Sequence, residues 1–129
     1  MTQSMVEFEL MFVEKLESLH AKEIDLDDVE DTMGTLNTTQ SDIEKLNRKE
    51  NLKKKDVMKL ITKSISAIHA DLDCLKLCNQ DALDRLEAEL KSKCEQSGEN
   101  DDQLKEILMN LAQVVTNINK KLDNLLNTL

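Results

Sequence analysis

The last quarter of the chain carries an unbroken row of apolar residues with the spacing of a coiled coil. The steps between them alternate four and three residues, so the repeat averages 3.5 and stays on one side of a slightly underwound helix. The members are Leu104, Leu108, Leu111, Val115, Ile118, Leu122, Leu125 and Leu129. A stripe this narrow needs a second helix with a matching stripe. The row, called the C-terminal seam below, therefore predicts a helix over 101–129 whose principal role is association.

A second row of the same kind runs through residues 56–94. It comprises Ile61, Ile65, Ile68, Leu72, Leu75 and Leu86, and predicts one long helix. Asn79 interrupts this row where Leu or Ile is expected. A polar Asn in a seam can fix register and partner number. The alternative is that the bundle is locally wider there and Asn79 is solvated.

The remaining segments give the predicted organisation of the chain. Residues 1–47 form one or two acidic helical segments, with a bend near Ile24 and a break within 35–42, where Thr, Asn and Ser are frequent. A basic connector, 48–55, follows. The loop at 97–101, with Gly98 suited to a helix C-terminus, joins helices 56–94 and 101–129 into an antiparallel hairpin.

Composition supports an all-α fold. The chain has no Pro, Trp or Tyr, only two Gly, and 33% charged residues, which is typical of coiled coils and long helices. Sustained apolar periodicity argues against intrinsic disorder, the competing class. Because a two-helix hairpin leaves apolar flanks uncovered, we expect an elongated coiled coil or helical hairpin that completes a multi-chain helical bundle.

No residue cluster predicts catalysis, a metal site or a cofactor site. Cys74 and Cys78 lie four residues apart, but structural zinc needs four ligands, and a nucleophilic Cys needs a His base in a cleft. We therefore expect no enzyme activity and no cofactor. No apolar run reaches the roughly 18 residues of a membrane span. The odd number of Cys residues favours a reducing compartment, cytoplasmic or nuclear.

Charge is unevenly distributed along the chain. Residues 1–47 contain twelve acidic and three basic residues, whereas 48–63 contains seven basic and two acidic residues. The basic patch comprises Arg48, Lys49, Lys53, Lys54 and Lys55. The chain has a net charge of −9 and no aromatic residue near this patch, so contact with an acidic protein surface, or with its own N-terminal half, is favoured over nucleic acid.

Two stretches resemble known families. The segment Asp71-Leu-Asp-Cys-Leu-Lys-Leu-Cys-Asn-Gln-Asp-Ala-Leu-Asp-Arg-Leu86, with Asp101-Asp-Gln-Leu-Lys105, resembles the coiled-coil region of the central-channel nucleoporins. The chain lacks that family's Trp residues and Phe-Gly repeats. The segment Glu9-Leu-Met-Phe12 is similar to the opening helix of the small spindle-and-kinetochore-associated subunit. Both resemblances imply a helical subunit of a larger assembly.

These observations together predict a non-enzymatic structural subunit of a hetero-oligomeric complex, acting as scaffold or adaptor by helix–helix association. The predicted partners are other helical subunits, in a nuclear pore, kinetochore or tethering assembly. The alternative is a self-sufficient homodimeric adaptor that binds a partner or nucleic acid through 48–63. The segregated charges favour an unlike partner, because parallel homodimers set like charges side by side.

Overall fold

The computed structural model describes residues 2–19, 23–98 and 101–128, and these fold into five helices with no strand among them. The helices are α1 (Gln3–Ser18), α2 (Leu26–Asn47), α3 (Lys54–Cys74), α4 (Gln80–Ser97) and α5 (Asp101–Thr128). The predicted all-α class is confirmed.

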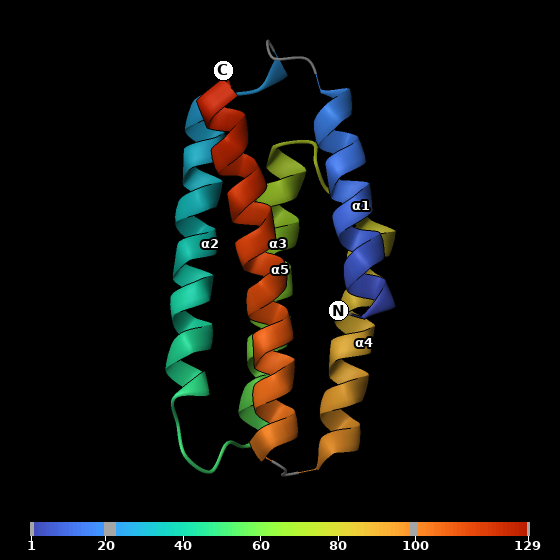
Figure 1. The fold of residues 1–129 in the computed structure, drawn as a ribbon, viewed down its shortest axis with the longest axis vertical. Coiled ribbons are helices and arrows are strands. Elements are labelled where there is room, and N and C mark those ends of the chain that lie inside the picture. Colours follow the sequence, from blue (N-terminus) through green and yellow to red (C-terminus); the bar gives the residue numbers. More distant parts are fainter. Residues whose placement is uncertain (1, 20–22, 99–100, 129) are drawn as a thin grey trace.

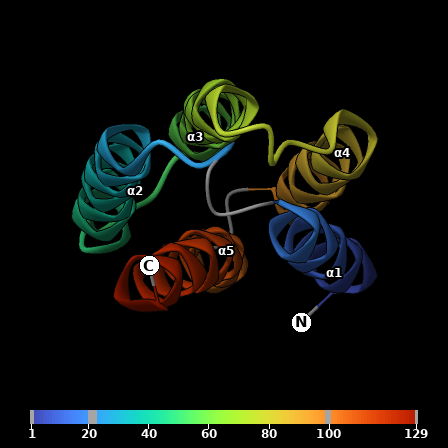
Figure 2. The ribbon, with the colours of Figure 1, turned by 90° about the horizontal axis from the view of Figure 1, so that it is seen from above.

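The helices run alternately up and down around one core (Figures 1 and 2). Seen from above, α2, α3, α4 and α5 form a ring of antiparallel neighbours, and α1 lies between α4 and α5. Because α1 is the shortest helix, it occupies only the upper half of the bundle, beside the C-terminal half of α5. The single chain therefore builds a bundle by itself, in contrast to the expected hairpin that other chains complete.

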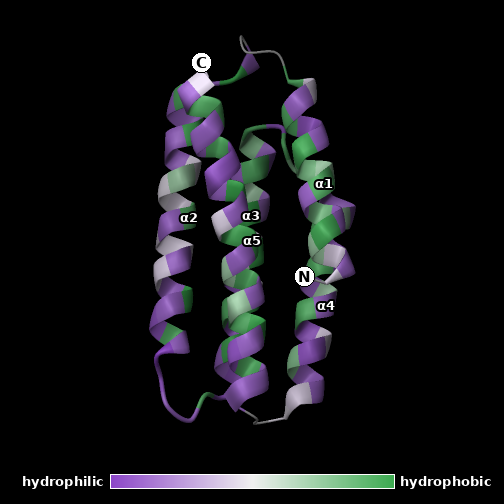
Figure 3. Ribbon diagram, viewed as in Figure 1, coloured by the Kyte–Doolittle hydropathy of each residue, from purple (hydrophilic) through white to green (hydrophobic). Residues whose placement is uncertain are grey.

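The only aromatic residues of the core are the chain's two Phe residues, which both lie on α1. Phe8 and Phe12 are 1% and 2% exposed and pack with Met5 against the rest of the cluster. In Figure 3 every helix carries both hydrophobic and hydrophilic residues, as expected for amphipathic helices around a shared interior. Burying each large apolar side chain contributes roughly 1.5–3 kcal/mol.

Helix α5 shows why the C-terminal seam does not require a second chain. Its buried stripe includes Ile107 and Val114 in addition to the seam, so it is wider than a strict heptad seam. A wide stripe faces several helices, and α5 contacts all four of the others. The seam is therefore covered within its own chain.

The prediction of one helix over 56–94 is wrong. The chain reverses between α3 and α4, over residues 75–79. Lys76 adopts a left-handed φ of 60°, its N–H donates to the Asp73 carbonyl, and the Leu77 N–H donates to the Leu72 carbonyl. This pair of bonds is a Schellman motif, which usually places Gly at the position of Lys76. With Lys there, the sequence has no Gly or Pro to mark the turn.

The predicted break within 35–42 is also absent, because α2 continues through it. The hydroxyls of Thr35, Thr38 and Thr39 donate to the carbonyls four residues earlier, so they do not compete with the helix. Thr32 and Thr39 are buried and complete a 3.5-residue repeat with Val29, Leu36 and Ile43. Thr therefore occupies two positions of the buried row of α2 at which Leu, Ile or Val is more usual.

Candidate partner-binding site

Most residues of the two predicted seams lie in the interior. Leu104, Leu108, Leu111, Val115, Ile118 and Leu122 are at most 1% exposed; the second seam, Ile61, Ile65, Ile68, Leu72, Leu75 and Leu86, is at most 9% exposed. Leu125 is partly buried, and Leu129 lies outside the described residues. Helices α1–α5 already bury these residues, so the seams are not an open surface of the single chain, and their role in binding a partner stays a prediction.

Asn79 does not belong to an apolar seam; it caps the N-terminus of a helix. It is the N-cap of α4, and its Oδ1 accepts a hydrogen bond of 3.0 Å from the Ala82 N–H. Its Nδ2 also lies 3.2 Å from the Met11 Sδ on α1. Capping a helix N-terminus with Asn contributes about 1 kcal/mol. Asn79 therefore starts α4 and does not set register inside a helix.

The basic patch lies at the lower end of the bundle. Arg48, Lys49, Lys53 and Lys55 are exposed, and Lys54 is partly buried with its Nζ 2.9 Å from the Glu95 carbonyl oxygen. The backbone N–H of Asn51, in the same loop, donates to the Asp101 carboxylate at 3.2 Å. The loop is thus tied to the α4–α5 end of its own chain, which is neither of the two pairings that the sequence favoured, and contact with an acidic protein surface stays a prediction.

A shallow, partly apolar groove lies between α1 and the C-terminal half of α5. Its cavity volume is about 470 Å³, and it is lined by Val13, Leu16 and Glu17 from α1 and by Lys121, Asn124, Leu125 and Thr128 from α5. The carboxylate of Glu9 accepts a hydrogen bond from the Asn117 side-chain amide and so joins the two helices beside this groove.

An exposed apolar row extends the groove along α1. Val6 and Leu10 are 42% and 59% exposed, and they precede Val13 by seven and three residues. Residues three and four apart share a face of a helix, so Val6, Leu10 and Val13 form one continuous strip. We call the strip and the groove together the α1–α5 face.

The sequence alone did not indicate this face. The stronger apolar stripe of the first helix comprises Met5, Phe8 and Phe12, and the structure buries it. The available signal was a second set of apolar residues, Val6 and Leu10, on the side away from that stripe. A helix with two apolar faces needs cover on both sides.

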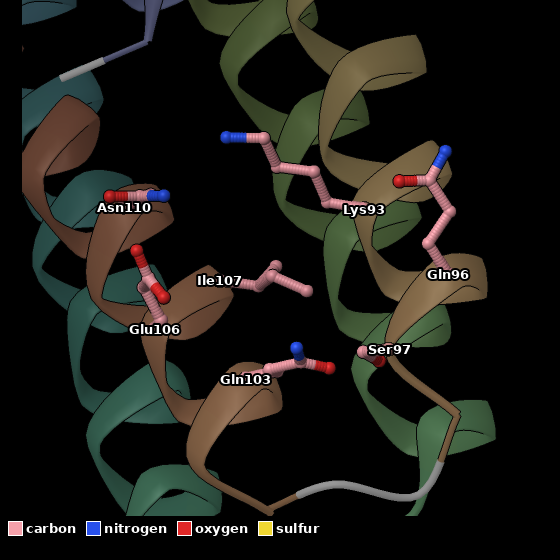
Figure 4. Close-up of a pocket in the computed structure, with 7 residues that line it drawn as sticks. All are labelled: Lys93, Gln96, Ser97, Gln103, Glu106, Ile107 and Asn110. Atoms are coloured by element: carbon pink, nitrogen blue, oxygen red, sulfur yellow. The ribbon is translucent and has the colours of Figure 1, made fainter.

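A second groove lies below the N-terminus of α1, where α1 no longer covers α4 and α5 (Figure 4). It has a volume of about 220 Å³, and most of its lining is polar: Lys93, Gln96, Ser97, Gln103, Glu106 and Asn110. Ile107 is its only apolar lining residue and is just 3% exposed. This groove offers little apolar area to a partner, so the α1–α5 face is the better candidate.

The cysteines are single thiols in this structure. Cys94 is buried, Cys78 is partly buried and Cys74 is exposed. Burial raises the pKa of the Cys78 thiol, and the nearby Asp73 carboxylate raises it further. A raised pKa disfavours the reactive thiolate. Within residues 2–19, 23–98 and 101–128, no three His, Cys, Asp or Glu side chains are grouped so as to hold a metal ion.

No known family model matches the chain, and no curated protein or solved structure is detectably similar to it. None of the described helices is both long enough and apolar enough to cross a membrane. The resemblances to nucleoporin and kinetochore subunits stay predictions. The case for function therefore depends on the chemistry of the surface.

Proposed function

We propose that the protein is a non-enzymatic structural subunit of a hetero-oligomeric assembly and that it binds a helical partner through its α1–α5 face. The observation that carries this proposal is the position of Val6 and Leu10. They are two of the four large apolar residues with substantial exposure among the described residues, and they share one strip beside an apolar groove. Exposed apolar strips bordered by polar residues are typical of interaction sites.

The proposal retains helix–helix association but moves it to another surface. The C-terminal seam stabilises the bundle, so the chain needs no partner to cover its interior. The other two exposed apolar residues, Leu26 and Met109, lie on α2 and on the lower half of α5, away from the α1–α5 face. They are exposed apolar positions outside the proposed interface, so substitutions there are suitable controls.

The proposal is tested by comparing Val6→Asp/Leu10→Asp with Met109→Asp in tagged full-length chain purified from its host. All three positions are exposed, so each variant keeps the helical circular dichroism spectrum of the parent. We expect the co-purifying subunits to be lost from the double variant and kept by Met109→Asp, because a charge placed in an apolar contact costs several kcal/mol.

Equal co-purification with both variants would contradict the proposal. The mass of the chain alone separates it from the alternative of a homodimeric adaptor. If the purified chain has the mass of a monomer and forms a larger species only when a partner is added, the hetero-oligomer is supported. A stable dimer dissociated by Val6→Asp/Leu10→Asp would instead show that a second copy occupies the α1–α5 face.

A further inference from the structure

The two walls of the groove on the α1–α5 face carry opposite charges. Glu17 projects from α1 and Lys121 from α5, and both line the groove. Glu14 precedes Glu17 by one turn on α1, and Lys121 alone supplies the positive charge of the α5 wall, since Lys120 lines the groove between α2 and α5. The first wall is therefore acidic and the second basic, with Leu16 and Leu125 contributing apolar surface between them.

The charges across the groove do not neutralise each other. The ion pairs found among the described residues include Lys63–Asp42, Arg85–Glu7, Lys91–Glu87 and Lys93–Glu89, and neither Glu17 nor Lys121 takes part in one. A groove with an apolar floor and unpaired, oppositely charged walls matches the surroundings of a helix in a coiled coil. There, charged flanks beside the apolar seam determine partner choice and orientation.

Resting on the proposed function, we infer that the groove binds one amphipathic helix with polar flanks of opposite charge. Its apolar stripe packs on Val6, Leu10 and Val13, its basic flank faces α1, and its acidic flank faces α5. Val6 and Glu17 are eleven positions apart on α1, or about 16 Å along the helix, so this stretch accommodates roughly three turns.

The same charges argue against a second copy as the occupant. Helix α1 carries four acidic residues and one basic residue. Packed into the groove of another copy, α1 would set like charges against the acidic wall, and like charges across helices are unfavourable. A helix with segregated charges satisfies both walls. Because reversing its direction exchanges its flanks, the walls also select one of its two orientations.

The probes are three synthetic 18-residue helices with one Leu/Ala stripe. One carries Lys on one flank and Glu on the other, the second carries Lys on both, and the third carries Glu on both. Their affinities for the full-length protein are measured by fluorescence anisotropy. We expect the mixed-flank peptide to bind about threefold more tightly than either uniform peptide, because it gains one weak surface ion pair and loses one like-charge contact.

Charge reversal of one wall provides the sharper test. Lys121→Glu makes both walls acidic, so the all-Lys peptide becomes the tightest of the three. Lys59→Glu is the matched control, because Lys59 is an exposed residue of α3 and the change in net charge is identical. It leaves the mixed-flank peptide tightest. Leu10→Asp weakens all three peptides at least about tenfold, whereas Met109→Asp does not.

Three results would overturn the inference: no peptide binds, the all-Lys peptide is tightest on the unmodified protein, or Lys121→Glu and Lys59→Glu give the same order. If no peptide binds but the co-purifying subunits are still lost from Val6→Asp/Leu10→Asp, the inferred charge pattern of the partner helix is refuted. The proposed function is then unaffected. Co-purification that is insensitive to Val6→Asp/Leu10→Asp refutes the proposed function itself, whatever the peptides do.

Discussion

Asp71, near the C-terminus of α3, is a partly buried carboxyl group on the side of the bundle that faces α2. Its Oδ2 is buried with no hydrogen-bond partner among the described residues. Burial raises the pKa of this carboxyl; the nearby Thr35 hydroxyl opposes the shift, and the Asp31 carboxylate on α2 adds to it. The folded protein therefore favours protonated Asp71 more than the unfolded chain does.

The pH dependence of stability follows from the direction of that shift. A raised pKa means that the contribution of Asp71 is present below its unfolded pKa and is lost as pH rises through its folded value. Asp71→Asn cannot ionise, so we expect it to be more stable than the parent at pH 7. In urea unfolding from pH 3 to 7, this gain should grow with pH.

The control for this prediction is Asp73→Asn, an exposed position in the last turn of the same helix. It changes the net charge and the charge near the helix end in the same way. If both variants give the same gain at every pH, burial of Asp71 is not the cause.

At the scale of an element, α2 contains a glycine for which the fold has no need. Gly34 lies in the middle of α2 on its solvent-exposed side, and no atom lies within 4 Å of the position that a Cβ would take there. Ala is about 1 kcal/mol more favourable than Gly inside a helix. Gly34→Ala should therefore raise the free energy of unfolding by about 1 kcal/mol, measured by urea denaturation.

Gly98→Ala, in contrast, should lower the free energy of unfolding. Gly98 is the C-cap of α4, with a φ of 63° that L-residues adopt at a cost of roughly 1–2 kcal/mol. Nothing crowds its Cβ position either, so the pair of variants differs in backbone conformation and not in packing. Stabilisation by both substitutions would show that the α4–α5 turn does not hold this φ.

At the scale of the whole molecule, α5 holds the bundle together. Leu111 and Ile118 are 0% and 1% exposed, so Leu111→Asp/Ile118→Asp places two carboxylates in the core. Each costs several kcal/mol, against a total stability of about 5–15 kcal/mol for a typical domain. We expect the double variant to lose its helical circular dichroism signal.

Gln113→Asp/Lys120→Asp is the matched control, with the same seven-residue spacing at exposed positions of α5. It should remain folded. A Leu111→Asp/Ile118→Asp variant that keeps its helicity and cooperative melting while losing only a partner would restore the seam as an association surface.

Three features of the structure differ in how well the sequence predicts them: the start of α5, the turn at Lys76 and the α1–α5 face. The limits of α5 were predictable, because Gly98 and the acidic pair Asp101–Asp102 are ordinary signals for a turn and a helix start. The turn at Lys76 was not, because Lys occupies a position where Gly is the usual signal. The α1–α5 face could not be predicted, because it depends on which helices become neighbours. No local pattern places Val13 opposite Leu125.

The contacts of α5 with every other helix also have a consequence for synthesis. Until residues 101–128 leave the ribosome, the apolar faces of α1–α4 have no fifth helix to cover them. At about 5–20 residues per second, making those 28 residues takes roughly 1.4–6 s. During that interval the nascent chain exposes the surfaces that chaperones bind. This bundle therefore cannot close before α5 has been synthesised.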